Sequence, residues 1–353
     1  MAHALKSAGI KIGWTTSPHL LSPTERIWID GMYCNEAYLD SLLARVLEVE
    51  RAVRIKATYF ELMVASAILA FKESSVDLAL VEVGMGGRWD STNILDPILT
   101  ILTNVAMDHM AHLGETPEAI AREKLCTARD GRPLVLGSGL NPDWVAPLCE
   151  SAPIIVASSI PSANIFWDHS IVNGHRINMV GSHQIENLAV ALTAIDVLRQ
   201  MGWELDDDEI YHGLSQAVWP GRLWKVPGLS NVIFDGAHNA NGAEALANHI
   251  NRFEIRAHLV FSAMGDKDIE GMARHLASTN PLSVTLVYID GPRYSTGEAL
   301  QDAWRRVGYG DLPLLSLDEL VPKLQGNVAD TLIVTGSLYF LGYLLKKLNI
   351  AVL

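Results

Sequence analysis

The chain has 353 residues, of which 49% are apolar and 19% are charged. This balance is typical of packed domains and argues against a disordered chain, and the length is sufficient for two ordinary domains. The 40 acidic residues outnumber the 27 lysines and arginines and give a formal net charge of −13, which disfavours sequence-independent binding to nucleic acid.

The cysteines and the apolar runs indicate where the protein resides. Cys34, Cys126 and Cys149 form no CxxC pair and are odd in number, which disfavours a disulfide framework or a zinc ribbon and favours a reducing compartment. Residues 1–13 lack the unbroken apolar run of a signal peptide, and the apolar run 332–345 is too short to cross a bilayer. We therefore expect a soluble, cytoplasmic protein with no membrane partner.

Short β-rich runs alternate with helical segments from the start of the chain. The predicted buried strands are residues 77–83, 98–104 and 133–136, and the predicted helices are residues 36–49, 59–71 and 117–128. This alternation predicts a parallel sheet with helices packed against it. Asp206 to Asp208 are expected to begin a further helix, where acidic side chains favour the helix dipole.

A second set of elements follows Pro220 and Gly221. The predicted strands are residues 231–235, 258–261, 284–289 and 332–335, and the predicted helices are residues 243–250, 297–307 and 338–347. We expect another α/β unit here and place the boundary at the WPGR segment, which gives domains 1–221 and 222–353.

The segment VEVGMGGRWDSTN (residues 81–93) carries a Gly-rich turn directly after a strand. Glu82 is expected at the carboxyl end of that strand, where ligands of open α/β sheets gather. A dinucleotide fingerprint would need a third glycine where Trp89 stands, so that kind of site is disfavoured. The turn could face a bound anion or could be purely structural, and the sequence favours neither interpretation.

Other polar residues also follow predicted strands. His109 comes after the run 98–104, and together with Glu82 it suits a divalent cation near phosphate, although a strand-end histidine is more often structural. The DGAHN segment (residues 235–239) is a plausible ligand edge, and Arg222 could reach a phosphate from the domain junction. Lys124 by itself is typical of a solvated surface residue. Neither G-x-S-x-G nor H-E-x-x-H occurs, so nucleophile-elbow hydrolases and zinc metalloproteases have no support.

The order of the motifs is more specific than any one of them. Along the chain occur TSPHL, ERI, TYFE, VEVGMGGRWDSTN, TN followed by DHMAHLG, REK, HQIEN, WPGR, DGAHN and VTGSLY. This order resembles the folylpolyglutamate synthase / dihydrofolate synthase branch of the Mur ligase superfamily. The resemblance implies a two-domain α/β fold with a parallel-sheet, ATPase-type N-terminal domain and a smaller Rossmann-like C-terminal domain.

The resemblance also implies an ATP-dependent ligase. Such an enzyme phosphorylates a folate or dihydropteroate carboxylate and joins L-glutamate to the acyl phosphate, with Mg²⁺ and cationic side chains stabilising the charge. ATP and Mg²⁺ are the implied cofactors, and a monomer is expected. The alternative is a catalytically dead remnant that still binds folate or nucleotide.

Carried over to this sequence, the resemblance gives roles to five positions in the first half. Ser17, Glu82 and His109 match magnesium ligands. Lys124 matches a lysine that the family uses in carbamylated form to orient the metal shell, and Arg26 matches an arginine near the substrate loop. Lys124, His109 and Arg26 are thereby the candidate catalytic residues.

Five further positions match nucleotide-binding or amino-acid-binding residues. Asn187 and Arg222 match ATP contacts, Asp235 and His238 match contacts with nucleotide and glutamate, and Ser337 matches a serine near the amino-acid pocket. One departure concerns the phosphate-binding loop, because residues 1–353 contain no G-x-x-x-x-G-K-[ST]. By the family spacing Met1 falls within the helix after that loop. We therefore expect a truncated version of a longer protein, impaired in catalysis, with an unpaired sheet edge and exposed apolar surface.

Overall fold

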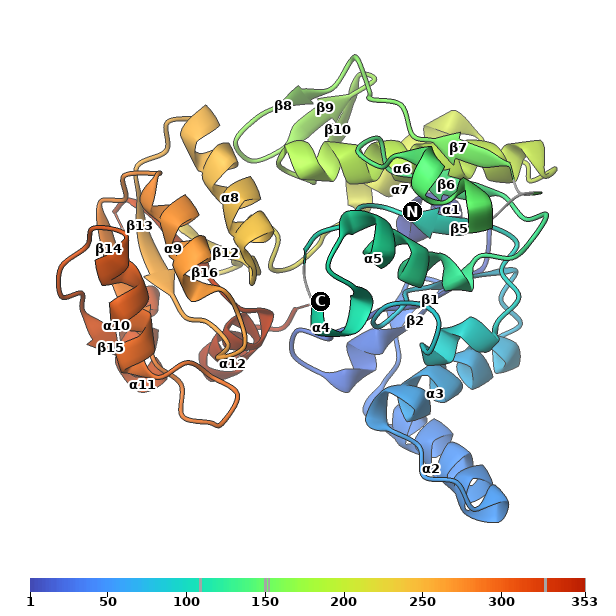
Figure 1. The fold of residues 1–353 in the computed structure, drawn as a ribbon, viewed down its shortest axis with the longest axis horizontal. Helices are drawn as coiled ribbons and strands as arrows, with labels where there is room; N and C mark the ends of the chain where they lie inside the picture. The colour runs from blue at the N-terminus through green and yellow to red at the C-terminus, as the bar shows by residue number, and fades with distance from the viewer. Residues whose placement is uncertain (108–109, 149–150, 152, 327–328, 353) are drawn as a thin grey trace. The chain divides into compact units, whose positions relative to one another are not determined.

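The computed structural model describes residues 1–107, 110–148, 151, 153–326 and 329–352. The chain forms two compact units, each built from several segments (Figure 1). Unit 1 comprises Met1–Ala163, Val172–Ile177 and Ile185–Ala217, and unit 2 comprises Asn164–Ile171, Asn178–Gln184 and Val218–Leu353. The chain therefore passes between the units several times, and the last passage lies between residues 217 and 218.

Unit 1 contains two small sheets. The first has the order β3-β2-β1-β4 and consists of β1 (Ile12–Thr15), β2 (Ile27–Ile29), β3 (Met32–Tyr33) and β4 (Leu78–Val81). Strands β1 and β4 are parallel, whereas β2 is antiparallel to both β1 and β3. The second sheet has the order β5-β6-β7 and is parallel, with β5 (Thr100–Leu102), β6 (Leu134–Leu136) and β7 (Ile154–Val156). Strand β10 (His175–Ile177) also belongs to this unit.

Strand β4 is less buried than its apolar sequence predicts. Leu78, Leu80 and Val81 are half-buried and Ala79 is exposed, whereas all three residues of β6 are buried. The difference follows from position, because β4 is the end strand of its sheet in the described part of the chain, and β6 has a neighbour on each side.

The helices of unit 1 begin at side-chain caps wherever the local sequence offers one. Asn35 caps α2, Thr58 and Glu61 form a capping box at α3, and Asp206 caps α7, as its run of aspartates predicts. The helices are α1 (Ala2–Ser7), α2 (Glu36–Val53), α3 (Tyr59–Glu73), α4 (Met110–Leu113), α5 (Pro117–Lys124), α6 (Ser182–Gln200) and α7 (Asp207–Gln216). Short 3-10 helices cover Pro23–Arg26, Ser91–Ile94, Leu125–Thr127, Pro142–Trp144 and Ala146–Leu148.

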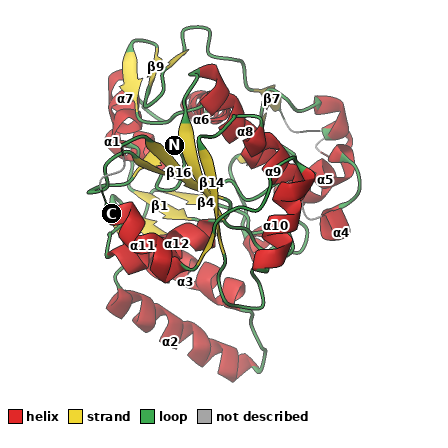
Figure 2. Cartoon of the chain, turned by 90° about the vertical axis from the view of Figure 1, so that its left-hand side faces the viewer, coloured by secondary structure: helices red, strands yellow, loops and turns green. Residues whose placement is uncertain are grey.

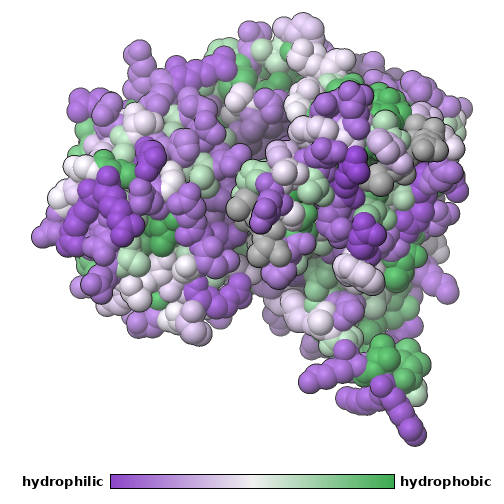
Figure 3. Space-filling model, in the orientation of Figure 1, coloured by the Kyte–Doolittle hydropathy of each residue, from purple (hydrophilic) through white to green (hydrophobic). Residues whose placement is uncertain are grey.

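Helix α2 runs one turn beyond its predicted end. It ends only at Arg54, which has a left-handed φ of 55°. Near that end Val49, Val53 and Ile55 are 61%, 56% and 63% exposed, and Figure 3 shows hydrophobic atoms gathered at the tip of this helix. The same face is buried in the first half of the helix, where Leu39 and Leu42 pack with side chains of α3 and β2.

Unit 2 is built on a six-stranded sheet in the order β11-β12-β16-β13-β14-β15. Five of these strands are parallel, and β11 joins the edge in the antiparallel direction. The strands are β11 (Trp224–Lys225), β12 (Val232–Asp235), β13 (Ala257–Phe261), β14 (Ser283–Val287), β15 (Leu314–Leu315) and β16 (Thr331–Thr335). The two-domain α/β expectation is thereby realised with parallel sheets in both units.

Helices lie on both faces of this sheet. They are α8 (Ala240–Arg252), α9 (Ile269–Ala277), α10 (Gly297–Arg306), α11 (Leu317–Gln325) and α12 (Leu338–Leu348). Figure 2 shows α9 and α10 on one side of β14 and β16, and α11 and α12 on the other. The sequence analysis did not predict α9 and α11, which are short and contain Gly271 and Pro322 respectively. No helix in the described ranges combines the length and the apolar character that a membrane span requires.

A β-hairpin is held on unit 2 by ring stacking and an ion pair. It consists of β8 (Asn164–Ile165) and β9 (Ser170–Val172). Trp167 at its turn stacks on His249 of α8, with ring centroids 5.1 Å apart, and His249 Nε2 donates to the Trp167 carbonyl at 3.2 Å. Asp168 accepts from His169 at 2.8 Å and from Lys225 Nζ at 3.2 Å, and these bonds, chiefly the one from His169, lower the pKa of Asp168 to about 2.

We expect Trp304 to be the most sensitive core position of unit 2. It is fully buried, its ring lies edge-on to Phe261 at 5.7 Å, and its indole N–H has no hydrogen-bond partner. Trp304→Ala should cost about 3–5 kcal/mol in free energy of unfolding, because it leaves a large cavity. Trp304→Phe should cost only about 1–2 kcal/mol, since it also removes the unpaired N–H. Urea unfolding measures both values, and equal losses would contradict this account of the site.

The buried His249 should make the attachment of the hairpin sensitive to pH. Burial is the main cause that lowers the pKa of His249 below its ordinary value of 6.5, so the native state holds the ring neutral while the unfolded state binds a proton near pH 6.5. The free energy of unfolding is therefore highest above pH 6.5, and it decreases as the pH falls because protonation favours the unfolded state. Hydrogen exchange of α8 amides should show the free energy of opening decline below that pH. His249→Gln should flatten the decline, and an unchanged profile in the variant would refute the assignment.

Candidate functional site

In unit 1 the carboxyl ends of β1 and β4 bring two predicted site residues together. Thr15 pairs with Val81 in parallel register, so the residues that follow each strand are neighbours. The Glu82 carboxylate accepts a hydrogen bond from the Ser17 backbone N–H at 2.7 Å and a short one from the Thr16 hydroxyl. Glu82 is otherwise exposed, so its carboxylate is both positioned and accessible.

The loop after β1 holds Arg26 in a buried position. The Glu25 carboxylate accepts from three consecutive backbone N–H groups, those of residues 20–22, at 2.6–2.8 Å. Arg26 is only 8% exposed; its Nε donates to His19 Nδ1 at 2.9 Å, and its guanidinium lies 5.3 Å from the Tyr59 ring centroid. Burial and the Arg26 charge lower the pKa of His19, which keeps that ring a neutral acceptor. Within the described ranges no carboxylate lies at ion-pair distance from Arg26.

The Gly-rich turn is closed by one of its own side chains. Asp90 Oδ2 accepts from the Gly84 and Met85 N–H groups at 3.0 Å each, while Asp90 Oδ1 caps the 3-10 helix that follows. Because these amides already donate to Asp90, they favour a structural role for the turn over binding of an external anion. Only glycine at position 87 allows the turn to approach the backbone of Lys124, because a Cβ there would lie 2.3 Å from the Lys124 carbonyl oxygen. The turn thus packs against the end of α5 and brings the Lys124 backbone beside it.

The oxygen donors at this edge fit a hard divalent cation. Mg²⁺ prefers carboxylate and hydroxyl oxygen and retains several waters, and Glu82 and Ser17 offer such groups side by side. The third predicted ligand, His109, lies outside the described residues. Among the residues that are described, no cluster of three His, Cys, Asp or Glu side chains forms a closed metal site. The donor set therefore resembles a partly hydrated magnesium site more than a structural zinc site.

In unit 2 the buried Asp235 ties the end of β12 to the preceding loop. Its Oδ2 accepts from the Leu223 N–H and its Oδ1 from the Ala237 N–H, both at 2.9 Å, and the residue is 6% exposed. The Gly236 N–H donates to the Gly221 carbonyl at 2.6 Å. Gly221 and Leu223, the two neighbours of Arg222 in the chain, are therefore both hydrogen-bonded to the end of β12. Asp235 thereby positions the loop that carries Arg222. The sequence analysis missed this function.

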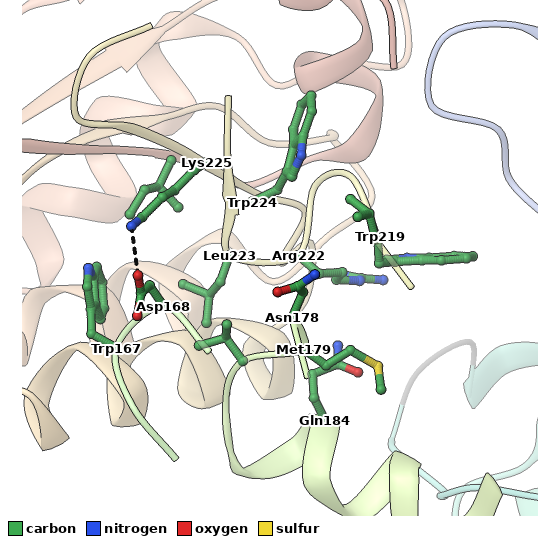
Figure 4. A pocket seen from close by; sticks show the side chains of 13 residues that line it. Trp167, Asp168, Asn178, Met179, Gln184, Trp219, Arg222, Leu223, Trp224 and Lys225 are labelled. Atoms are coloured by element: carbon green, nitrogen blue, oxygen red, sulfur yellow. Dashed lines mark hydrogen bonds and ion pairs between the residues drawn. The ribbon is translucent and has the colours of Figure 1, made fainter. Parts of the chain in front are cut away.

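Arg222 lines a pocket of about 200 Å³. Figure 4 shows Arg222, Trp219, Asn178, Met179 and Gln184 gathered on one side of it, and Trp167, Asp168 and Lys225 on the other. The remaining lining residues are Val180, Val218, Leu223, Trp224 and Ile233. The pocket combines a cation, amides and indole rings, which suits a flat, polar, anionic ligand. No sequence motif indicated most of these residues, because they come from four segments, residues 167–168, 178–184, 218–225 and 233.

The other predicted residues of unit 2 lie at the carboxyl edge of its sheet. His238 Nδ1 donates to the Gly236 carbonyl at 2.9 Å. Ser337 is 1% exposed and caps α12, where its hydroxyl accepts from the Phe340 N–H at 3.5 Å. Asn187 lies in unit 1, on an exposed position of α6. The predicted set is thus divided, with Ser17, Arg26, Glu82, Lys124 and Asn187 in unit 1 and Arg222, Asp235, His238 and Ser337 in unit 2.

The sequence and the structure were compared with those of known proteins. Residues 221–338 match the family model described as Mur ligase, glutamate ligase domain. A probable dihydrofolate synthetase of Schizosaccharomyces pombe is 33% identical over 99% of this chain and 89% of its own length. The dihydrofolate synthase/folylpolyglutamate synthase of Bacillus subtilis is 31% identical over 98% and 86%.

A solved structure agrees with these sequence relatives. A bifunctional folylpolyglutamate synthase/dihydrofolate synthase with Mn, AMPPNP and L-glutamate bound superposes with a TM-score of 0.81 at 28% identity, over 99% of this chain and 85% of that one. One family accounts for the motif order, for the parallel sheets with polar residues at their carboxyl ends, and for these matches. The chain belongs to the dihydrofolate synthase/folylpolyglutamate synthase family of Mur ligases.

Proposed function

We propose that this protein is an ATP-dependent ligase that joins L-glutamate to the carboxylate of a folate or of dihydropteroate through an acyl phosphate. The observation that carries the proposal is similarity over 98–99% of the chain to relatives named for these two activities. A solved relative holds a nucleotide analogue, a divalent metal and L-glutamate together, which supports the same substrates here.

The contacts described above suggest how the work is divided in unit 2. Arg222, held in place through Asp235, would bind nucleotide phosphate as a planar, permanently charged donor. Trp219, which is 42% exposed, would provide a surface on which a base can stack. Asp235 and His238 would complete the nucleotide edge, Ser337 would face the amino acid, and Asn187 would add an ATP contact from unit 1.

In unit 1 the proposed residues stabilise the negative charge that develops when phosphate is transferred to the acceptor carboxylate. A bound Mg²⁺ would neutralise phosphate charge during transfer, and Ser17, Glu82 and His109 would hold it. Arg26 is a buried cation with no carboxylate nearby in the described ranges, so an anionic substrate would compensate its charge. Lys124 would act in carbamylated form, as an anion that orients the metal shell.

We further infer that the protein works as a monomer in the cytoplasm and that its domains divide near residues 219–222. The odd number of cysteines, with no CxxC pair, supports a reducing compartment, and the net charge of −13 disfavours nucleic-acid partners. The matched family model begins at residue 221, which supports the proposed boundary.

The proposed reaction predicts when ADP is released. The full-length protein should release ADP only when L-glutamate and a folate or dihydropteroate acceptor are both supplied, since the acyl phosphate forms on the acceptor and glutamate consumes it. A coupled ADP assay with each substrate omitted in turn measures this, and mass spectrometry should find the acceptor heavier by one glutamyl residue. ADP release that is indifferent to glutamate would overturn the assignment.

Glu82→Gln tests the metal edge without removing its hydrogen bonds. The amide oxygen can still accept from Ser17 and Thr16, but the negative charge is lost, so the Mg²⁺ concentration for half-maximal rate should rise at least about tenfold. Glu61→Gln is a matched control, because the Glu61 carboxylate also accepts from a backbone N–H and a threonine hydroxyl, both of Thr58. Mg²⁺ titration of the rate compares the two variants, and equal Mg²⁺ dependence would remove Glu82 from the proposed metal site.

A further inference from the structure

A loop at the carboxyl edge of the unit 2 sheet holds an arginine that the proposed mechanism does not use. This loop, residues 290–296, follows β14. The Gly265 N–H donates to the Arg293 carbonyl at 2.9 Å, and the Ser295 N–H donates to the Ala263 carbonyl at 3.1 Å. An isolated bridge also joins Met264 to Tyr294. The backbone of Arg293 is therefore fastened to the segment that follows β13, next to β16.

The side chain of Arg293 is held as well, but by an aromatic ring. Its guanidinium lies 5.0 Å from the ring centroid of Tyr339, in the first turn of α12 and two residues after Ser337. Arg293 is exposed, and the described residues place no carboxylate at ion-pair distance from it. Three other exposed arginines of unit 2 have acidic partners, namely Arg274 with Glu270, Arg305 with Asp302 and Asp311, and Arg306 with Glu270. Arg252 and Arg256 are also exposed and form no ion pair within the described residues, but neither lies at the carboxyl edge of the sheet.

The surroundings of this guanidinium favour an anion. The first turn of α12 presents the positive end of a helix dipole. Burial raises the pKa of Tyr294 to about 12, so this phenol stays neutral and does not repel negative charge.

We propose that Arg293, stacked on Tyr339, binds a carboxylate of the incoming amino acid and contributes to its selection. This inference rests on the proposed function, and it names a residue to which the motif order assigns no role. An amino acid with two carboxylates needs two points of charge recognition. A planar guanidinium binds a carboxylate through two parallel hydrogen bonds, which fixes orientation as well as affinity.

Arg293→Gln separates a role in amino-acid binding from a role in the fold. The KM for L-glutamate should rise about 10–100-fold, which corresponds to the loss of charge-assisted hydrogen bonds. The KM values for ATP and for the folate acceptor, the kcat at saturating glutamate and the melting temperature should stay near those of the wild type. Arg274→Gln is the matched control, since its guanidinium already pairs with Glu270 at 2.7 Å, and it should leave every constant unchanged.

Two comparisons sharpen the result. Tyr339→Phe keeps the ring under the guanidinium and should behave as the wild type, whereas Tyr339→Leu should raise the KM for glutamate in the same way as Arg293→Gln. If Arg293 binds the side-chain carboxylate, the ratio of kcat/KM for glutamate to kcat/KM for glutamine should fall in Arg293→Gln. If Arg293 binds the α-carboxylate, the corresponding ratio for glutamate over glutamate α-amide should fall instead. An unchanged KM for glutamate, or an equal rise in the KM for ATP, would overturn the proposal.

Failure of this proposal can be distinguished from failure of the proposed function. If the wild-type protein releases no ADP in response to glutamate, the ligase assignment fails on its own. Binding of L-glutamate to the whole chain, measured by calorimetry, still tests Arg293. A dissociation constant that weakens in Arg293→Gln but not in Arg274→Gln supports the site, and equal constants in both variants reject it.

Discussion

The loops at the strand ends depend on one constraint, which is that their backbone N–H groups need acceptors where no regular secondary structure supplies them. Carboxylates meet this need repeatedly. Glu25 accepts from three consecutive amides, Asp90 closes the Gly-rich turn, and Asp235 joins residues on either side of it. Each carboxylate fixes a loop in one conformation, and the functional side chains of that loop are placed as a consequence.

Three loops near strand ends carry arginines that have no ion pair among the described residues. Arg26 rests on His19 and the Tyr59 ring, Arg222 lies between two residues that are fastened to the end of β12, and Arg293 stacks on Tyr339. In a chain with a net charge of −13, most other arginines have carboxylates close by. Of these three only Arg26 is buried, and it is the one whose charge is costly to hold without a counter-charge.

The two units support their loops differently. In unit 2 the loops stand on a six-stranded sheet with helices on both faces, so the edge at Asp235 and Ser337 has a rigid base. In unit 1 the corresponding edge at Glu82 stands on β4, an end strand with half-exposed side chains in the described part of the chain. Local opening is easier where fewer apolar contacts hold a strand, so the edge at Glu82 should open more readily than the edge at Asp235.

The sequence alone determined the fold class, four of the six strands of the unit 2 sheet and the residues that follow them, because apolar runs and strand-end polar residues leave local patterns. It also determined the family, through the order of short motifs. Only the tertiary structure decided that Asp90 occupies the Gly-rich turn, that Asp235 positions Arg222, and that Arg293 rests on Tyr339 without an acid. The Arg293 contact joins segments far apart in the chain, and the Asp235 contact joins two loops, so neither leaves a local pattern. The Asp90 contact is local, but residue type and spacing do not show whether the turn amides face this carboxylate or a bound anion.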